Sequence, residues 1–149
     1  MKKTVTATVT HRFRASAERV FDAWLDPVTA RAWMSVTNPS LGEPDVRRVE
    51  IDARVGGRFT FSDMRADGEA VHWGEYRLID RPRKLVFTWW TSEEEEEADL
   101  STVTLTIEPD DTGCVASIVH EMSAEWSEWI PQTRQGWGGM LDQIDTHLT

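Results

Sequence analysis

The sequence predicts an α+β fold with an antiparallel sheet of about seven strands and a long C-terminal helix. Between Val49 and Met122 apolar residues recur at every second position, and short turns separate the runs, which is typical of antiparallel strands. After Pro131 the apolar spacing changes to that of a helix. The 149 residues suit one domain over 1–149, because a chain of this length buries roughly 68–70% of its unfolded surface.

The chain is expected to begin with a strand and two short helices. Threonines alternate with Val5, Ala7 and Val9, the period of two of a half-buried strand. Ser16 is placed as the N-cap of a first helix, whose apolar stripe is Val20, Phe21, Trp24 and Leu25. Asp26-Pro27 ends that helix and starts a second one, with Ala30, Trp33 and Met34 on one side. Pro and Gly between Asn38 and Pro44 predict a connecting loop.

The next segments alternate as strands. Gly56-Gly57 predicts the turn between a strand at 49–51 and one at 58–62. In the segment 72–80, Tyr76 and Leu78 fall on one face while Trp73 and Ile79 fall on the other, which suggests a bulge near Gly74.

A second group of strands follows the turn at 81–83. Leu85, Phe87 and Trp89 share one face of the first. The block Glu93–Glu97 is interpreted as a solvated, mobile hairpin loop, because like charges repel one another. A turn at 110–113 joins the strand at 102–107 to one that carries Ala116, Ile118 and His120.

The last segment predicts the long helix. Its stripe is Trp137, Met140, Leu141, Ile144 and Leu148, at spacings i, i+3, i+4, i+7 and i+11, and Pro131 is suited to open it. The cluster Gly136, Gly138 and Gly139 costs roughly 1 kcal/mol per residue relative to alanine. The cluster therefore indicates either a close approach of backbone or ligand, or a kink or fraying.

Composition limits the possible partners. A net charge of -10 repels phosphate backbones, so a nucleic-acid partner is not expected. Cys114 is the only cysteine, so neither an internal disulfide nor a thiolate zinc site is expected, and a cytoplasmic location fits. A signal peptide and an 18-residue apolar run are both missing, so membrane insertion is not expected. Eight tryptophans predict an aromatic core or a lined pocket.

The ordered segments resemble a known family. They are SAERVFDAWLDP with Trp33 after it, GGRFTF, GEYRLIDRPRKLVFTW, VTLTIEPDDTG leading to His120-Glu121, and GWGGMLDQIDTHL. This set resembles the START-related helix-grip (SRPBCC) superfamily, within it the family named after the activator of the heat-shock-protein-90 ATPase. The resemblance implies that the sheet grips the last helix and leaves a cavity for a small hydrophobic molecule such as a lipid. The eukaryotic activators carry a further N-terminal domain for which this chain has no room.

From this resemblance we expect a cavity wall made by both the sheet and the helices. The expected sheet residues are Phe59, Phe61, Phe87, Trp89, Ile118 and His120. The expected helix residues are Trp137, Met140, Leu141 and Ile144, with Trp24 and Trp33 near the mouth. The alternative is that these side chains only fill the core. His120 points inward by strand parity, either as a ligand contact or as a core histidine with its own partners.

Three functions are compatible with the sequence. A binding protein for a small hydrophobic molecule is preferred, and a chaperone partner or a cyclase- or hydrolase-like enzyme are the alternatives. An enzyme would need to bring Asp63, Glu75 and His120 together as an acid/base set, whereas the alternative and preferred role of the two carboxylates is surface charge. Motifs for a nucleophile, a metal, a phosphate or a dinucleotide are missing, so we expect no cofactor and no metal. The ligand and the oligomeric state are not encoded in a readable motif.

Overall fold

Seven strands among the described residues form one antiparallel sheet, in the order β1-β7-β6-β5-β4-β3-β2. The computed structural model describes residues 3–37 and 43–149. The strands are β1 (Thr4–Phe13), β2 (Val46–Ile51), β3 (Arg58–Arg65), β4 (Gly68–Asp80), β5 (Lys84–Thr88), β6 (Thr102–Asp110) and β7 (Gly113–Ser123). The helices are α1 (Ala17–Leu25), α2 (Pro27–Met34), α3 (Glu93–Ala98), the 3₁₀ helix η1 (Ala124–Trp129) and α4 (Ile130–Leu148).

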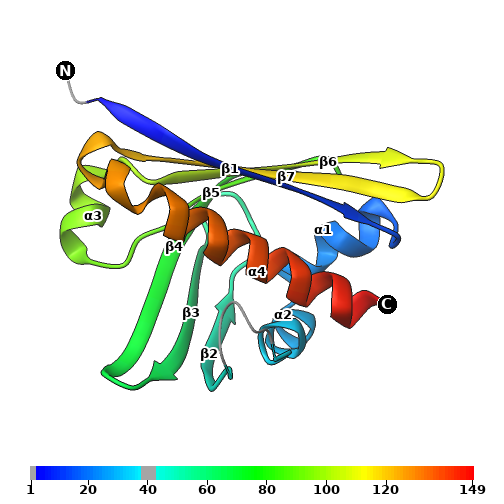
Figure 1. Cartoon of the computed structure of the whole chain (residues 1–149), viewed down its shortest axis with the longest axis horizontal. Coiled ribbons are helices and arrows are strands. Elements are labelled where there is room, and N and C mark those ends of the chain that lie inside the picture. The colour runs from blue at the N-terminus through cyan, green and yellow to red at the C-terminus, as the bar shows by residue number, and fades with distance from the viewer. Residues whose placement is uncertain (1–2, 38–42) are drawn as a thin grey trace.

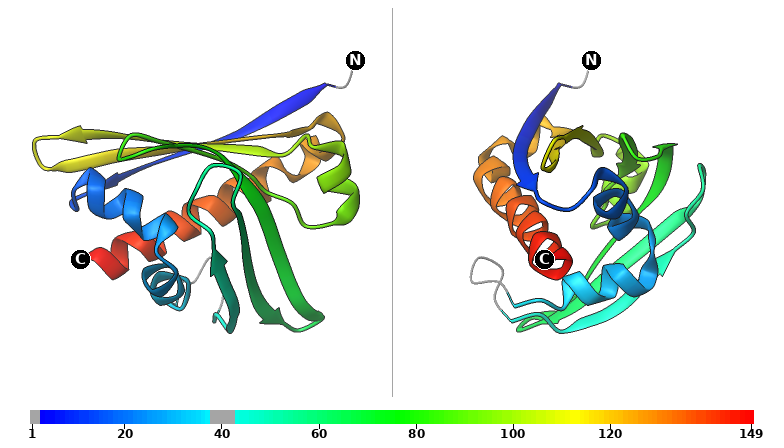
Figure 2. Two further views of the ribbon diagram at one scale, coloured as in Figure 1. Left: turned by 180° about the vertical axis from the view of Figure 1, so that it is seen from behind. Right: turned by 90° about the vertical axis from the view of Figure 1, so that its right-hand side faces the viewer.

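The sheet curves around α4. Figure 1 shows α4, in orange and red, crossing in front of the strands, and the end view in Figure 2 shows the sheet bending round it. Helices α1 and α2 contact α4 and lie near its C-terminal end. The predicted architecture, a seven-stranded antiparallel sheet around a long last helix with two short helices after the first strand, is confirmed.

The first two helices begin at the predicted caps. The Ser16 side chain accepts a hydrogen bond from the Arg19 N–H, which satisfies one of the free donors at the start of α1. Asp26 does the same for the Val28 N–H of α2. The predicted apolar stripes face the core: Val20, Phe21, Trp24, Ala30 and Trp33 are all buried.

The central strands follow their sequence period. In β6, Val103, Leu105 and Ile107 are buried while the threonines between them are half-buried. In β7, Ile118 and His120 point inward as their parity predicts. One hydrophobic core, formed by residues of the sheet, α1, α2 and α4, fills the end of the molecule where the two short helices lie.

The predicted facing of β4 is wrong. The pairing of β4 with β5 shifts between Tyr76 and Leu78, so the bulge lies at Arg77 and not near Gly74. The extra residue reverses the parity beyond it, which leaves Tyr76 buried and Leu78 exposed. Ile79 consequently packs against the core.

The predicted mobile loop at Glu93–Glu97 is also wrong, because these residues form α3. Ser92 caps the helix by accepting from the Glu95 N–H. Glutamate is a good helix former, and carboxylates in a first turn interact favourably with the helix dipole. Glu96 also accepts from Trp73 Nε1 at 2.6 Å and from Arg58 at 3.1 Å, which ties α3 to the sheet.

Pro131 lies at the start of α4, as predicted, and the helix continues through the glycine cluster. A Cβ placed on Gly136 would meet nothing within 4 Å, and one on Gly138 would meet only Val9 at 3.8 Å. Close backbone approach therefore does not explain these two glycines, and Gly136 lies next to open space.

Two further sequence predictions concern the loop before β2 and the insertion of the chain into a membrane. Residues 38–42 of the loop predicted over Asn38–Pro44 lie outside the described residues. Among the helices of the described chain, none combines the length and the apolar character needed to cross a membrane.

Candidate functional site

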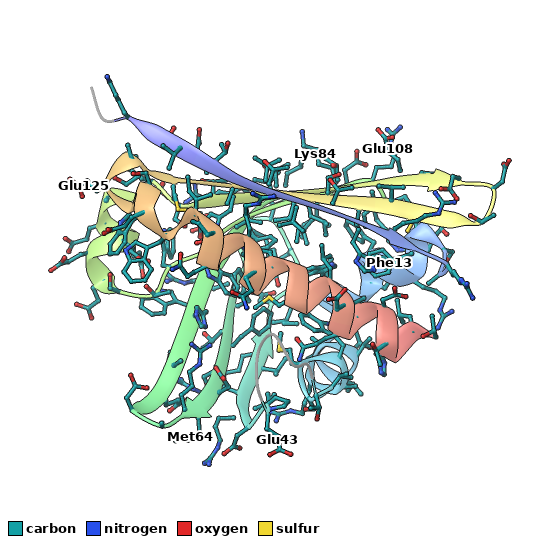
Figure 3. All side chains as sticks on the ribbon, in the orientation of Figure 1. Phe13, Glu43, Met64, Lys84, Glu108 and Glu125 are labelled. Carbon is teal, nitrogen blue, oxygen red and sulfur yellow. The ribbon has the colours of Figure 1, made fainter. Side chains whose placement is uncertain are left out.

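The described residues form one large cavity, of about 1150 Å³, between the sheet and the part of α4 from Thr133 to Gln143. Its wall comes from β3, β4, β7 and α4, and its outer part from η1, α3 and the segment after α2. Figure 3 labels Glu43, Met64 and Glu125, three lining residues around its outer part, whereas the buried Phe13 lies at the other end of the molecule. The core thus fills one end of the fold and leaves the other hollow.

The structure divides the predicted wall residues into two groups. The first lines the cavity: Trp33, Phe61, Trp89, His120, Trp137 and Met140. The second belongs to the packed core: Trp24, Phe59, Phe87, Ile118, Leu141 and Ile144. Trp24, Phe59 and Phe87 border only a small space of about 10 Å³, and Ile118, Leu141 and Ile144 are fully buried. Sequence period correctly assigns the inward face, but it does not tell where along that face the core ends.

A cluster of aromatic rings makes the inner wall. Trp89, next to the end of β5, lies at its centre, with its ring 4.8 Å from the His72 ring in a stacked arrangement and 4.9 Å from the Trp137 ring. Phe61 packs 6.3 Å from Trp89. These separations lie in the range where aromatic pairs attract one another beyond simple burial. The rings therefore hold each other in place and present a wall of fixed shape.

A hydrogen-bonded chain runs along this wall. Trp137 Nε1 donates to His120 Nδ1 at 3.1 Å, and His120 Nε2 lies 2.7 Å from Ser101 Oγ. An indole N–H can only donate, so Nδ1 of His120 must accept and carries no proton. The neutral imidazole then has its proton on Nε2 and donates it to Ser101. His120 is thus a core histidine with two partners, and it also lines the cavity.

Both imidazoles on the wall are uncharged at neutral pH. Burial lowers the pKa of His120 to about 4. Burial also lowers the pKa of His72 to about 4, with a further lowering by the nearby Arg65 charge and a smaller opposing effect of Asp63. The inner wall is therefore aromatic and neutral.

Charge is confined to other parts of the lining. Five carboxylates contribute: Glu43, Asp63, Glu94, Glu95 and Glu125. Among the described lining residues the only basic ones are Lys3 and Arg65, and Arg65 already pairs with Asp63 at 3.1 Å. The Gln143 amide nitrogen donates to the carbonyls of Met34 and Val36, which joins α4 to the end of α2. The net charge of the lining is negative.

Sequence reasoning missed several lining residues. His72 shares strand parity with Tyr76, so alternation could have found it. Trp126 and Trp129, about half exposed, come from the segment after β7, whose fold had not been predicted. Ser101 lies just before β6, and no pattern in the sequence distinguishes it from the other serines.

The proposed acid/base set does not converge. Asp63 pairs with Arg65, and Glu75 lies 3.5 Å from Arg77. Neither carboxylate hydrogen-bonds to His120, whose two ring nitrogens have other partners. Because Nε2 of His120 carries the proton, it cannot accept one from Ser101 and does not activate a nucleophile there. Burial raises the pKa of the Cys114 thiol to about 11, so this cysteine is also unreactive at neutral pH.

Within 3–37 and 43–149, no group of three or more His, Cys, Asp or Glu side chains is arranged to hold a metal ion.

A curved antiparallel sheet that grips a long last helix, with a cavity between them, defines the class of helix-grip proteins. The family model described as "Activator of Hsp90 ATPase homolog 1-like protein" matches residues 14–149, and the chain belongs to this family. The family is part of the SRPBCC superfamily, whose members generally bind hydrophobic ligands.

Solved structures with the same fold come from several bacteria. A protein from Mycobacterium smegmatis is 28% identical with a TM-score of 0.77, and the match covers 97% of this chain and 90% of that one. An AHSA1-like protein from Aeromonas hydrophila is 21% identical with a TM-score of 0.74, covering 97% and 92%. A protein of unknown function from Staphylococcus aureus is 14% identical with a TM-score of 0.79, covering 98% and 94%. No curated protein matches the chain.

Proposed function

We propose that this protein binds a small hydrophobic molecule in the cavity between α4 and the sheet. The observation that carries the proposal is the cavity itself. Its volume of about 1150 Å³ is slightly above the roughly 300–1,000 Å³ typical of small-molecule sites. Aromatic rings and methionines line its inner part, and polar and charged side chains line much of the rest. Transfer of apolar ligand surface out of water, worth roughly 25 cal/mol per Å², is the driving force.

Gly136 supports the same proposal. It lines the cavity in the middle of α4, where a Cβ would meet nothing within 4 Å. Glycine lowers helix stability by roughly 0.5–1 kcal/mol relative to alanine, and no packing contact here requires it. A larger side chain at this position would occupy space that we assign to the ligand.

The direct test is native mass spectrometry of the protein purified from its own host. We expect an added mass from a retained ligand, and binding of the uncharged fluorescent probe N-phenyl-1-naphthylamine once that ligand is removed. Gly136→Leu should fold normally and reduce probe affinity at least tenfold, because the new side chain fills the cavity. Gly138→Ala is the matched control, since Gly138 does not line the cavity. The absence of both an added mass and probe binding in the wild type would contradict the proposal.

The name of the family suggests a second function, contact with the Hsp90 chaperone. Trp126 and Trp129 of η1 favour this second function, because 45% and 47% of their surface is exposed to solvent. Large exposed aromatic residues are common in protein interfaces. Under this proposal, the protein changes the ATPase rate of the chaperone from the same host, and the double variant W126S/W129S does not. An unchanged rate with the wild-type protein would contradict it.

A further inference from the structure

The hydrogen-bonded chain on the cavity wall determines which polar group a ligand can meet. Trp137 donates to His120, and His120 donates to Ser101 Oγ. Ser101 Oγ therefore accepts in this pair, and its own hydroxyl hydrogen is not used by His120. Among the described residues no other group accepts from that hydroxyl, and Ser101 lines the cavity.

We propose that the Ser101 hydroxyl donates a hydrogen bond to the ligand, and that the ligand is an uncharged aromatic molecule with a carbonyl or ether oxygen. The inference rests on the proposed function and adds the class of ligand to it. Trp137 and His120 act as positioning residues, because together they determine the direction in which the Ser101 hydroxyl donates.

The lining explains why the ligand is uncharged. An ion of either sign inside the cavity would lose its hydration, and the inner wall of aromatic rings and neutral imidazoles has no charged group to pair with it. Of the two basic lining residues, Arg65 is already paired with Asp63. The five carboxylates of the lining repel an anion further.

The ring cluster explains why the ligand is aromatic. The Trp89 ring is held 4.8 Å from the His72 ring and 4.9 Å from the Trp137 ring. A flat ligand can stack on or meet the edges of such rings with little loss of side-chain entropy, because the rings are already ordered.

The test uses three naphthalene probes of similar size, with tryptophan fluorescence quenching as the readout. They are 2-acetylnaphthalene with a ketone oxygen, 2-isopropylnaphthalene with no acceptor, and the 2-naphthoate anion. Loss of one neutral hydrogen bond corresponds to about a fivefold loss of affinity. Ser101→Ala should therefore weaken ketone binding about fivefold and leave hydrocarbon binding unchanged. Naphthoate should bind more weakly than the ketone.

Thr102→Val is the matched control, because it removes a hydroxyl from the adjacent residue, which does not line the cavity. It should leave both affinities unchanged. Trp137→Phe removes the N–H that determines the His120 tautomer, so the ratio of ketone to hydrocarbon affinity should fall in this variant too. If Ser101→Ala does not fold, Ser101→Cys keeps a similar side chain with a much weaker donor and should give the same change.

Equal ketone affinity in the wild type and in Ser101→Ala, with hydrocarbon binding intact, would overturn the role of Ser101 and leave the proposed function standing. Naphthoate binding as tightly as the ketone would overturn the uncharged class. Failure of all three probes to bind the wild-type protein would overturn both this inference and the proposed function.

Discussion

His72 and His120 each place a neutral imidazole on the cavity wall, and their burial makes the folded state less stable at low pH. The folded-state pKa of each is about 4, below the ordinary value of 6.5. Between these two values the unfolded chain binds more protons than the folded one, so stability increases with pH in this window. The stability that depends on the two neutral histidines is fully present above pH 6.5 and is lost as the pH falls toward 4.

We therefore predict that the free energy of unfolding decreases by about 2 kcal/mol per histidine between pH 7 and pH 5. Urea unfolding at the two pH values measures it. His72→Phe keeps a ring against Trp89 but cannot titrate, so it should remove about half of this decrease. The same decrease in His72→Phe as in the wild type would show that His72 does not cause it.

Trp137 has three roles in the structure. Its ring packs on Trp89 inside the cavity and on Phe87 in the core, and its N–H determines the tautomer of His120. The helical spacing of the sequence places Trp137 on the inward face of α4. The hydrogen bond to His120 could not be predicted, because the partner lies on a different element and the bond depends on the rotation of both rings.

At the level of elements, α3 shows how local sequence signals can outweigh composition. Five consecutive glutamates predict a solvated loop by charge repulsion, yet Ser92 caps a short helix at this point. Arg58 and Trp73 then bind Glu96, which offsets part of the repulsion. The cap is visible in the sequence, whereas the two partners on β3 and β4 are not.

Gly74 on β4 lies at a position that leaves no room for a side chain. A Cβ on Gly74 would lie 2.0 Å from the Thr88 carbonyl oxygen and 2.8 Å from the Phe59 ring. We predict that Gly74→Ala lowers the free energy of unfolding by on the order of 3 kcal/mol or more, since backbone must move to relieve the clash. Chemical denaturation measures this.

The comparison variant is Gly136→Ala, which places the same methyl group in open space on α4. It should raise stability by about 0.5–1 kcal/mol, because alanine is the better helix former. A loss of stability in Gly136→Ala similar to that in Gly74→Ala would contradict the assignment of open space to this side of α4.

At the level of the whole molecule, α4 borders both the packed end and the hollow end of the fold. Leu141 is fully buried in the core, whereas its neighbour Met140 lines the cavity. We predict that Leu141→Ala lowers the free energy of unfolding by about 3 kcal/mol, because it opens a new void in a packed region. Met140→Ala should lower it by about 1 kcal/mol, since its surroundings are already open.

Thermal or urea unfolding of the two variants measures the difference, and both variants change helix propensity in nearly the same way. Equal losses in the two would mean that the space beside Met140 is packed as closely as the core. Met140→Ala should also enlarge the space available to a ligand, which the probe affinity reports.

The periodicity of the sequence was sufficient for the elements and their order, and the resemblance to the helix-grip superfamily was needed for the way they pack. Alternation in 102–107, the caps at Ser16 and Asp26, and the stripe from Trp137 to Leu148 are local features, and each acts within a few residues of its own position. The same local signals indicated which side chains point inward. They failed at Arg77, because the uneven alternation in 72–80 indicates that a bulge exists but not at which residue the parity reverses.

Which inward side chains enclose a cavity, and which pack against one another, was decided only by the tertiary structure. Ile118 and His120 share a face of β7, yet the first is sealed in the core and the second borders open space. The difference depends on where α4 crosses the curved sheet and how far apart the two lie at each point. That distance is set by contacts between residues far apart in the chain, and no local pattern records it.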